Sequence, residues 1–406
     1  MRIAYIGQKG IFVRAGSPSR DQLRRSETGG VETHVENLSL QLAEKGHDIF
    51  VYCRPHFCFI RRKKYLGVNL IKLPSIPTKN LDTITHVLIS TIHALFKRYD
   101  IIHYHGVGPA TLAWIPRLLK PRTKVVVTFH SIDRLHQKWN WFAKKYLRFG
   151  EWAACKFPHE TIVVSKMLQK YCKKNFGRQT IYLPNGVLMP RKPRVEPIRK
   201  WGLKPNEYIL AVSRLVRHKG MHYLIHAYRE IVAQGLAMTK GAKLLIVGAP
   251  SHTEEYFNEL KSMAVGDENI IFAGYQRGEA LRSLFGNCYF FVHPSESEGL
   301  AITVLEAMSF GKCALVSDIP ENLEAIGKSG VSFKSTNVKD LREKMEALLK
   351  NPEKVKKIGV RAKLFIKRNY EWSGIVKKLE KFYVALRPGY AERLRQGEEP
   401  QGDKLS

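Results

Sequence analysis

The sequence has few acidic residues and no long apolar segment. Its 406 residues contain 67 Lys and Arg but only 36 Asp and Glu, which gives a formal net charge of +31. No run of about 18 apolar residues is present, which excludes an obvious membrane-spanning helix. The first residues, MRIAYIGQKGIF, also lack the apolar core and cleavage site of a signal peptide. We therefore expect a cytoplasmic protein.

Cysteine is scarce as well. The six cysteines are scattered and form no CxxC pair, which argues against a zinc site or a disulfide framework. We expect reduced and partly buried thiols at Cys53, Cys58, Cys155, Cys172, Cys288 and Cys313.

What remains is typical of a soluble α/β protein with more than one domain. Apolar residues make up 44% and charged residues 25% of a chain long enough for two or three full cores. Strand-like runs alternate with amphipathic helices from RIAYIG onward, and the pattern restarts at YILAVSRL. Such alternation predicts a parallel sheet in each half. The basic, proline-rich segment 183–197 between them is predicted to be a linker.

The fold class predicted is therefore α/β, with two Rossmann-like doubly wound domains that face a cleft. We place an N-terminal domain at 1–187 and a C-terminal domain at 188–370. An amphipathic helix is expected at 371–390, and the charged tail 391–406 should be disordered. The apolar face of that helix is Trp372, Ile375, Val376, Leu379, Phe382 and Tyr383.

Two acids stand out in the segment SESEGLAITVLEAMSFG. If the chain is helical from about Leu300, Glu298 and Glu306 lie roughly 12 Å apart along the axis. That is too far for a retaining glycosidase pair, whose carboxyl groups are about 5 Å apart. The spacing suits a ligand with polar groups at two separated points.

Cations and acids follow neighbouring strands of the second half, at the edge where open parallel sheets bind ligands. SRLVRHKG, after YILAV, supplies Arg214 and Lys219, which can hold a diphosphate. SESEGL follows YFFVHP, so Glu298 can accept from a sugar ring and Glu306 from a ribose. The N–H groups of Gly299, Leu300 and Ala301, expected at a helix start, add an anion site.

These motifs resemble the retaining glycosyltransferases of family 4, which have the GT-B fold. The likeness covers SRLVRHKG, FAGYQRGEAL, HPSESEGLAITVLEAMSFGKCALVS and LPNGV, and extends to GGVETHVENLSLQLAEKGHDIFVYCRP, DIIHYHGVGPA and VVVTFHS in the first half. By this resemblance 1–187 would be the acceptor-side domain and 188–370 the nucleotide-sugar-binding domain, and the helix 371–390 would cross back to the first domain. It implies that Arg214 and Lys219 bind the donor diphosphate, Glu306 the ribose and Glu298 the transferred sugar. Gly274 and Tyr275 of FAGYQRGEAL join the donor-binding set, Gly29 and Gly30 bring amides to the phosphates, and His130 touches the donor sugar near the reacting carbon.

The resemblance also implies a reaction. The donor would be a UDP- or GDP-sugar, no metal or other cofactor would be needed, and the acceptor hydroxyl would attack on the face that the diphosphate leaves. The acceptor is instead suggested by the basic charge of the first domain: an anionic or membrane-bound glycan, such as a polyprenyl-linked one, in cell-surface polysaccharide biosynthesis.

Several first-half residues have two interpretations. Gly29 and Gly30 present bare N–H groups to an anion, or form a flexible turn. His130 lies in the cleft, or is a structural histidine. His103 and His105 share one face of a strand, but no third metal ligand of suitable spacing is evident. IGQKG departs from the dinucleotide-binding pattern G-x-G-x-x-G, which makes nicotinamide binding a weak alternative.

Two further segments stay open in function. The polar, arginine-rich segment from Gly10 to Gly30 is longer than the family loop, and is interpreted as a lid or an acceptor contact. Trp139 and Trp141 form an aromatic acceptor platform, or pack beneath the following helix.

The positive charge is concentrated in the first half. Through Pro190 the net charge is +20, from 31 Lys and Arg against 11 Asp and Glu, and after it +11, from 36 against 25. Clusters at 61–64, 120–124, 144–148 and 173–174 suit phosphates or an anionic membrane at the inner face, or are merely solvated. Rival functions are a nucleic-acid-binding protein, for which no motif is present, and a sugar-nucleotide epimerase or phosphorylase.

Overall fold

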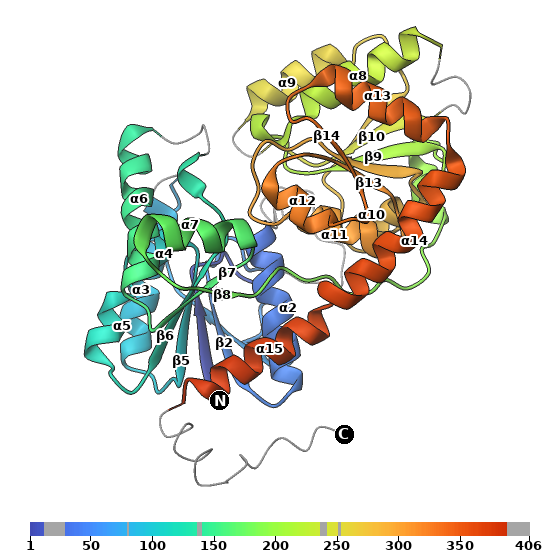
Figure 1. Ribbon diagram of the computed structural model, residues 1–406. Coiled ribbons are helices and arrows are strands. Elements are labelled where there is room, and N and C mark those ends of the chain that lie inside the picture. Colours follow the sequence, from blue (N-terminus) through green and yellow to red (C-terminus); the bar gives the residue numbers. More distant parts are fainter. Residues whose placement is uncertain (12–28, 79–80, 136–139, 236–241, 251–252, 388–406) are drawn as a thin grey trace. The chain divides into compact units, whose positions relative to one another are not determined.

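The computed structural model describes residues 1–11, 29–78, 81–135, 140–235, 242–250 and 253–387. The predicted tail, Trp139 and the segment 12–28 lie outside these residues. The chain divides into two compact units (Figure 1). Unit 1 is Met1–Pro184 with Trp372–Ser406, and unit 2 is Asn185–Glu371. The chain thus passes from unit 1 to unit 2 after Pro184, where the sequence predicted a boundary after residue 187.

Unit 1 contains one sheet of eight strands in the order β3-β4-β2-β1-β5-β6-β7-β8. All neighbours are parallel except β3 and β4, which form a short hairpin that the periodicity did not predict. The strands are β1 (Arg2–Ile6), β2 (Asp48–Cys53), β3 (Lys64–Tyr65), β4 (Val68–Lys72), β5 (Ile101–His105), β6 (Lys124–Phe129), β7 (Glu160–Val163) and β8 (Ile181–Tyr182).

Helices cover both faces of this sheet. Helices α2 and α15 pack together on one face, and α3 to α6 lie on the other (Figure 1). Their bounds are α2 (Gly30–Glu44), α3 (Leu81–Leu95), α4 (Val107–Ala110), α5 (Trp114–Leu119), α6 (Trp141–Lys156), α7 (Lys166–Phe176) and α15 (Trp372–Ala385), with a 3₁₀ turn η1 (Asp133–Leu135).

Unit 2 contains a fully parallel sheet of six strands in the order β11-β10-β9-β12-β13-β14. The strands are β9 (Tyr208–Val212), β10 (Lys243–Val247), β11 (Ile270–Gly274), β12 (Phe290–His293), β13 (Ala314–Ser317) and β14 (Val331–Phe333). The helices are α8 (Met221–Ala233), α9 (Glu254–Met263), α10 (Gly278–Asn287), α11 (Ile302–Ser309), α12 (Pro320–Ile326), α13 (Val338–Leu349) and α14 (Pro352–Asn369), with 3₁₀ turns η2 (Glu196–Trp201) and η3 (Arg217–Lys219).

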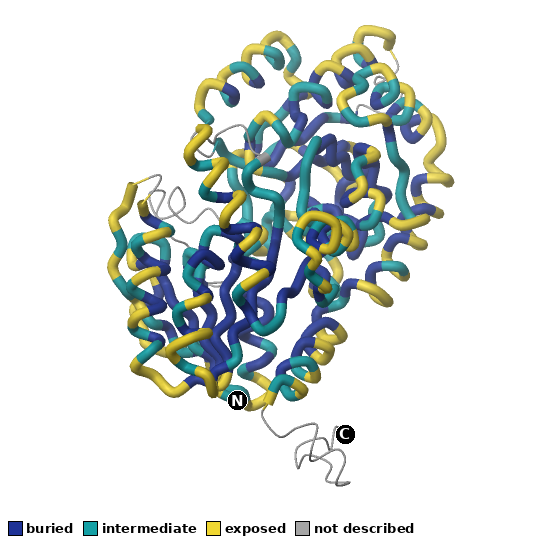
Figure 2. The backbone as a smooth tube through the Cα atoms, turned by 60° about the vertical axis from the view of Figure 1, so that its left-hand side comes forward, coloured by how far each residue is buried: buried dark blue, intermediate teal, exposed yellow. Residues whose placement is uncertain are grey.

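The predicted doubly wound α/β architecture is confirmed in both units. In each sheet the strand order reverses beside the first strand, between β1 and β5 in unit 1 and between β9 and β12 in unit 2. Such a switch point opens a crevice at the carboxyl ends of the strands because the flanking connections diverge to opposite faces. The strands are buried beneath helices whose outer faces are exposed (Figure 2).

Helix α15 returns to unit 1, as the sequence predicted. It packs against α2, and Trp372, Ile375, Val376, Leu379 and Tyr383 are buried in the core of that unit. Phe382 is only partly buried against the same core.

The first part of the segment 183–197 is not a loose linker, in contrast to its composition, whereas residues 188–197 are exposed or half-buried. Leu183, Asn185 and Val187 are buried, and the Val187 N–H donates to the Tyr370 carbonyl at 2.8 Å. Proline and basic residues are compatible with packed extended chain, so composition alone could not separate the two cases.

Candidate active site

The switch point of unit 2 brings together two loops that are far apart in the sequence. The loop after β9 ends in η3, and Gly220 follows with a φ of 69°. A Cβ atom there would approach the Pro294 carbonyl oxygen to 2.1 Å, so only glycine allows this contact. The Glu296 N–H donates to the His218 carbonyl at 2.8 Å, which fastens the loop after β12 to the first.

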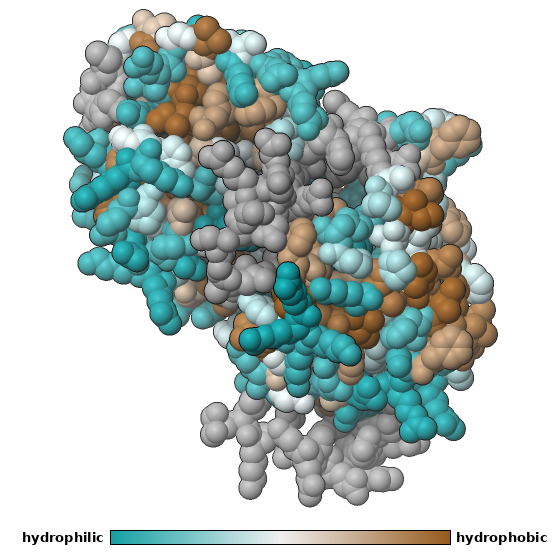
Figure 3. All heavy atoms as spheres, turned by 180° about the vertical axis from the view of Figure 1, so that it is seen from behind, coloured by the Kyte–Doolittle hydropathy of each residue, from teal (hydrophilic) through white to brown (hydrophobic). Residues whose placement is uncertain are grey.

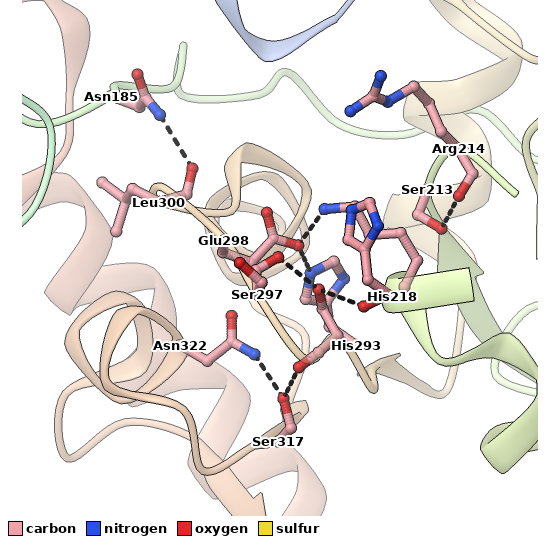
Figure 4. Close-up of polar contacts among 12 residues, drawn as sticks. Asn185, Ser213, Arg214, His218, His293, Ser297, Glu298, Leu300, Ser317 and Asn322 are labelled. Atoms are coloured by element: carbon pink, nitrogen blue, oxygen red, sulfur yellow. Dashed lines mark hydrogen bonds and ion pairs between the residues drawn. The ribbon is translucent and has the colours of Figure 1, made fainter. Parts of the chain in front are cut away.

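Lys219, Glu298 and His293 form a buried polar network at this point (Figure 4). The Glu298 carboxylate accepts from the Lys219 ammonium and, at 2.6 Å, contacts His293 Nε2. The side chains of Lys219 and Glu298 are only 12% and 10% exposed. The network places the predicted sugar-binding acid and the predicted phosphate-binding cation side by side.

The charged groups of this network stabilise each other's ionised forms. Burial by itself would raise the pKa of Glu298, but Lys219 and His293 hold that pKa well below its usual range. Burial lowers the pKa of Lys219, and neighbouring Arg214 lowers it further, while Glu298 opposes the shift. Because both ions are withdrawn from water, removal of either one would leave a costly unpaired charge.

A second set of contacts supports the loop that carries Glu298. The Ser317 hydroxyl donates to the Ser295 carbonyl, and Asn322 Nδ2 donates to the Ser317 hydroxyl at 2.9 Å (Figure 4). Serine and asparagine are common loop residues, so these positions could not be recognised from the sequence as supports of the site.

Arg214 lies on the same loop as Lys219 but is exposed. Among the residues that the structure describes, its guanidinium has no hydrogen bond or ion pair, and Figure 4 shows it outside the network of dashed contacts. A guanidinium can donate two parallel hydrogen bonds to a phosphate. Arg214 is therefore available to an anionic ligand.

Glu306 is the second acid of the sequence motif and has a different environment. It lies on α11, and burial raises its pKa to about 7. Within the described part of the chain its carboxyl group has no hydrogen-bond partner. A half-buried carboxyl group of this kind can accept hydrogen bonds from the hydroxyl groups of a ligand.

The helix that carries Glu306 starts later than the sequence indicated. Helix α11 begins at Ile302, with Ala301 as its N-cap, because Gly299 and Leu300 are in extended or turn conformation. The spacing of 12 Å along a helix axis therefore does not apply to Glu298, which precedes the helix. The N–H groups of Gly299, Leu300 and Ala301 have no acceptor among the described residues, and Asn185 Nδ2 fixes the Leu300 carbonyl at 2.9 Å.

Gly274 and Tyr275 lie at the end of β11, on the same edge of the sheet as the loops above. Gly274 has a φ of 66°, and its carbonyl accepts from the Gly248 N–H at 3.0 Å. A Cβ atom on Gly248 would come within 1.8 Å of the Ser213 carbonyl oxygen, so the ends of β9, β10 and β11 are in close contact.

In unit 1 the carboxyl edge carries histidines instead of charges. His130 follows β6, is 8% exposed, and its Nε2 lies 3.2 Å from His105 Nδ1 at the end of β5. The ring of His34 on α2 packs edge-on against His130 with centroids 4.9 Å apart. Burial lowers the pKa of His105 and His130 well below the usual range, so both rings are neutral near pH 7.

The sequence interpretation of these histidines needs a correction. His103 and His105 do share one face and stack with centroids 4.2 Å apart, but two further histidines complete the group. One ligand atom each from His34, His105 and His130 lies within 4.8 Å of the others, the residue type that binds divalent metals. The adjacent strand ends of β5 and β6 were the available signal. That the protein needs no metal remains a prediction.

His103 is part of an uncharged hydrogen-bonded chain. Its Nδ1 contacts the Tyr383 hydroxyl at 2.5 Å and its Nε2 the Thr128 hydroxyl at 2.7 Å. Burial lowers its pKa well below the usual range. Helix α15 thereby connects directly to the histidine cluster of unit 1.

The amide of Gly29 is not bare, contrary to the sequence interpretation. Gly29 caps α2, and its N–H donates to Glu32 Oε2 at 2.9 Å, while the Lys9 N–H donates to Glu32 Oε1 at 3.2 Å. A carboxylate of the chain itself thus occupies the position expected for an anion. Gly30 is exposed at the first position of the helix.

Trp141 and the cysteines have clear outcomes. Trp141 is 59% exposed with the Lys145 ammonium 3.8 Å from its ring centroid, so it does not pack in the core. The six cysteines are free and buried, as predicted. No helix in the described parts of the chain is both long and apolar enough to cross a membrane.

Comparison with known proteins agrees with the fold. Residues 28–189 match the model for Glycosyltransferase Family 4, and residues 195–365 match that for Glycosyl transferases group 1. An uncharacterized glycosyltransferase of Methanocaldococcus jannaschii, MJ1178, is 24% identical over 372 residues, which cover 88% of this chain and 95% of its own. The serotype-specific mannosyltransferase WbdA of Escherichia coli is 30% identical over 156 residues, or 38% of this chain and 19% of WbdA.

Solved structures share the fold at low sequence identity. Anabaena Alr3699/HepE, solved with UDP and glucose, has a TM-score of 0.76 at 17% identity and covers 95% of this chain and 100% of its own. Sucrose-phosphate synthase of Thermosynechococcus elongatus has a TM-score of 0.78 at 19% identity, with 98% and 100% coverage. Since the two family models together span both units, this chain belongs to the family 4 glycosyltransferases of group 1 and has the GT-B fold.

Proposed function

We propose that this glycosyltransferase moves a sugar from a nucleoside-diphosphate donor to a glycan or lipid-linked acceptor with retention of the anomeric configuration. The observation that carries the proposal is the carboxyl edge of the sheet in unit 2, where Lys219 pairs with Glu298 and where the Arg214 and Glu306 side chains have no partner among the described residues. The two cations suit a diphosphate, and the two acids suit the hydroxyl groups of a sugar and of a ribose.

Each residue has a separate task in this proposal. Arg214 and Lys219 bind the diphosphate and stabilise the charge that develops when the glycosidic bond breaks. Glu298 accepts from hydroxyl groups of the transferred sugar, and Glu306 from the ribose. Gly299, Leu300 and Ala301 offer N–H groups that can bind a phosphate or sugar oxygen.

The remaining assignments follow the family resemblance. His130 acts at the donor sugar near the reacting carbon, and its low pKa makes it a neutral hydrogen-bonding group rather than a cation. Gly274 and Tyr275 contribute to the nucleotide side, and Gly30 contributes an amide from unit 1. The diphosphate oxygen takes the proton of the acceptor hydroxyl as the acceptor attacks on the same face.

The donor is proposed to be a UDP- or GDP-sugar. Alr3699/HepE has been solved with UDP and with UDP-glucose, which supports UDP, whereas the partial match to a mannosyltransferase leaves GDP open. The match to WbdA, a serotype-specific enzyme, also supports a role in surface polysaccharide biosynthesis.

Calorimetric titration with UDP, GDP and ADP tests the donor site. We expect one nucleotide to bind wild type and the Arg217→Ala control, because Arg217 already pairs with Glu259 away from the network. The Arg214→Ala, Lys219→Ala double variant should lose that binding. Equal binding by the double variant would contradict the assignment.

Product analysis separates the chemistry from its rivals. A transferase forms a glycosylated product only when acceptor is added, whereas an epimerase converts the nucleotide sugar alone and a phosphorylase requires phosphate. Tight, steeply salt-dependent binding to random DNA would instead favour the nucleic-acid-binding alternative.

A further inference from the structure

Helix α3 in unit 1 buries a largely polar face and exposes an apolar one. Its buried face carries polar side chains, among them His86 and Ser90, and burial lowers the pKa of His86 to about 4. Within the described part of the chain, both ring nitrogens of His86 and the Ser90 hydroxyl have no hydrogen-bond partner. A helix on the surface of a globular protein normally has the opposite arrangement, with apolar residues toward the core.

The outer face of α3 is an apolar stripe. Five large side chains recur every three or four residues, so they lie on one side of the helix. Their exposed fractions are 44% for Leu81, 38% for Ile84, 41% for Leu88, 46% for Ile92 and 82% for Phe96.

Helix α5 extends this stripe. It packs beside α3, and Lys120 at its end donates to the carbonyl of Leu95 at 3.0 Å, which fixes the two helices together. Trp114, Leu118 and Leu119 are 42%, 68% and 66% exposed. The eight residues of α3 and α5 are called here the α3/α5 face; apolar side chains gather over this part of unit 1 in Figure 3.

Helix α6, on the same side of the sheet, alternates aromatic and basic residues. Its exposed aromatic residues are Trp141, Phe142, Phe149 and Trp152, and its exposed cations are Lys144, Lys145, Arg148 and Lys156. Amphipathic aromatic rings and long basic side chains are the residues that favour the boundary between lipid tails and headgroups.

The charge around this surface has one sign. Residues 81–159 contain 12 Lys and Arg against 4 Asp and Glu. The acids are engaged within the unit: Asp82 with Arg54, Asp100 with the Arg2 N–H, Asp133 with Ser131, and Glu151 with Arg134 and Arg148. Two copies of such a surface would repel each other, which argues against a self-associating interface.

We propose that the α3/α5 face, flanked by α6, docks this enzyme on an anionic lipid bilayer. The apolar stripe enters the headgroup boundary while the cations contact anionic headgroups, as in an interfacial amphipathic helix. The basic clusters by themselves could only attract the protein to an anionic membrane. The α3/α5 face adds apolar area that can enter the membrane and keep the protein bound. The inference deepens the proposed function and rests on it, since a lipid-linked acceptor would be reached from this surface.

Vesicle co-sedimentation of the full chain tests the proposal. The probes are vesicles of phosphatidylcholine alone and of phosphatidylcholine mixed with phosphatidylglycerol. We expect wild type to bind only the anionic vesicles, and binding to fall as salt is added. The variant Ile84→Ser, Leu88→Ser, Ile92→Ser should bind at least tenfold more weakly, and Lys97→Ser with Arg98→Ser about fivefold more weakly for each charge.

A matched control removes apolar residues elsewhere. Val360 and Leu364 on α14 of unit 2 are 57% and 53% exposed, so their replacement by serine changes surface hydropathy without touching the α3/α5 face. This variant should bind vesicles as wild type does. UDP or GDP titration and thermal unfolding of every variant report the donor site and the fold separately from the membrane.

Three results would overturn the docking surface. Equal binding of wild type to neutral and anionic vesicles, or equal loss in the α14 control, would remove the case for the α3/α5 face. A dimer in solution that the triple serine variant dissociates would assign the face to a second copy instead. If wild type bound neither UDP nor GDP, the proposed donor site would be contradicted, but the vesicle result would still stand.

Discussion

The switch points of the two sheets occupy equivalent places in their folds but use opposite chemistry. Unit 2 buries the Lys219 cation against Glu298, and the next helix carries a second acid, Glu306, without a partner among the described residues. Unit 1 buries neutral imidazoles at His103, His105 and His130. A charged pair costs more to bury than a neutral ring, and it can hold a diphosphate. A neutral histidine can contact a sugar without attracting or repelling it.

The largest effect should come from breaking the charged pair. We expect Lys219→Met to weaken nucleotide binding by at least about 100-fold and to lower the free energy of unfolding by about 3 kcal/mol, since Glu298 stays buried without its cation. Calorimetry and urea unfolding measure the two losses. The double variant Lys219→Met, Glu298→Gln should regain stability without regaining binding; if both return together, the pair has only a structural role.

The histidine edge should affect rate rather than donor affinity. Replacement of His130 by alanine is expected to lower the transfer rate about 100-fold, as for loss of one hydrogen-bonding group at a reacting centre, while nucleotide affinity stays unchanged. Steady-state kinetics and calorimetry on the same variant separate the two quantities. A loss of nucleotide affinity as large as that of Lys219→Met would erase the proposed division between the units.

Glu306 should make the folding stability depend on pH. Its folded pKa of about 7 exceeds the ordinary value of 4.5, so the folded state keeps a proton that the unfolded chain has released. The stabilisation from this group is present below pH 4.5 and is lost as pH rises toward 7, by at most about 3 kcal/mol. Glu306→Gln should therefore flatten the fall in stability over this window, measured by urea unfolding.

The same residue gives a proton readout for the donor. If ribose hydroxyl groups donate to the carboxylate, nucleotide binding near pH 7 should release a proton, which calorimetry in buffers of different ionisation enthalpy detects. Unchanged proton release in Glu306→Gln would show that another group titrates.

The smallest effect should come from the uncharged chain in unit 1. Tyr383→Phe removes the partner of His103 Nδ1 and should cost about 1 to 3 kcal/mol of unfolding free energy, because a buried polar atom is left unsatisfied. The transfer rate should change little, because His103 reaches His130 only through His105, which lies between them. Phe382→Leu on the partly buried side of the same helix is the matched control.

Much of this arrangement could be predicted from the sequence. The alternation of strands and helices, the return of α15, and the placement of Arg214, Lys219 and Glu298 after β9 and β12 all depend on local periodicity and on the rule that ligands bind at strand carboxyl ends. The extended start of α11 and the packed segment around Val187 escaped prediction, because both depend on contacts with residues distant in the sequence.

By itself, then, the sequence determined the α/β class, the family motifs and the excess of positive charge. Only the tertiary structure decided that Lys219 would pair with Glu298, that Glu32 would cap the Gly29 amide, and that His34 would join His105 and His130. It also decided that α3 buries its polar face and exposes its apolar face, because the buried face of a helix depends on the layer it packs against and not on its period alone.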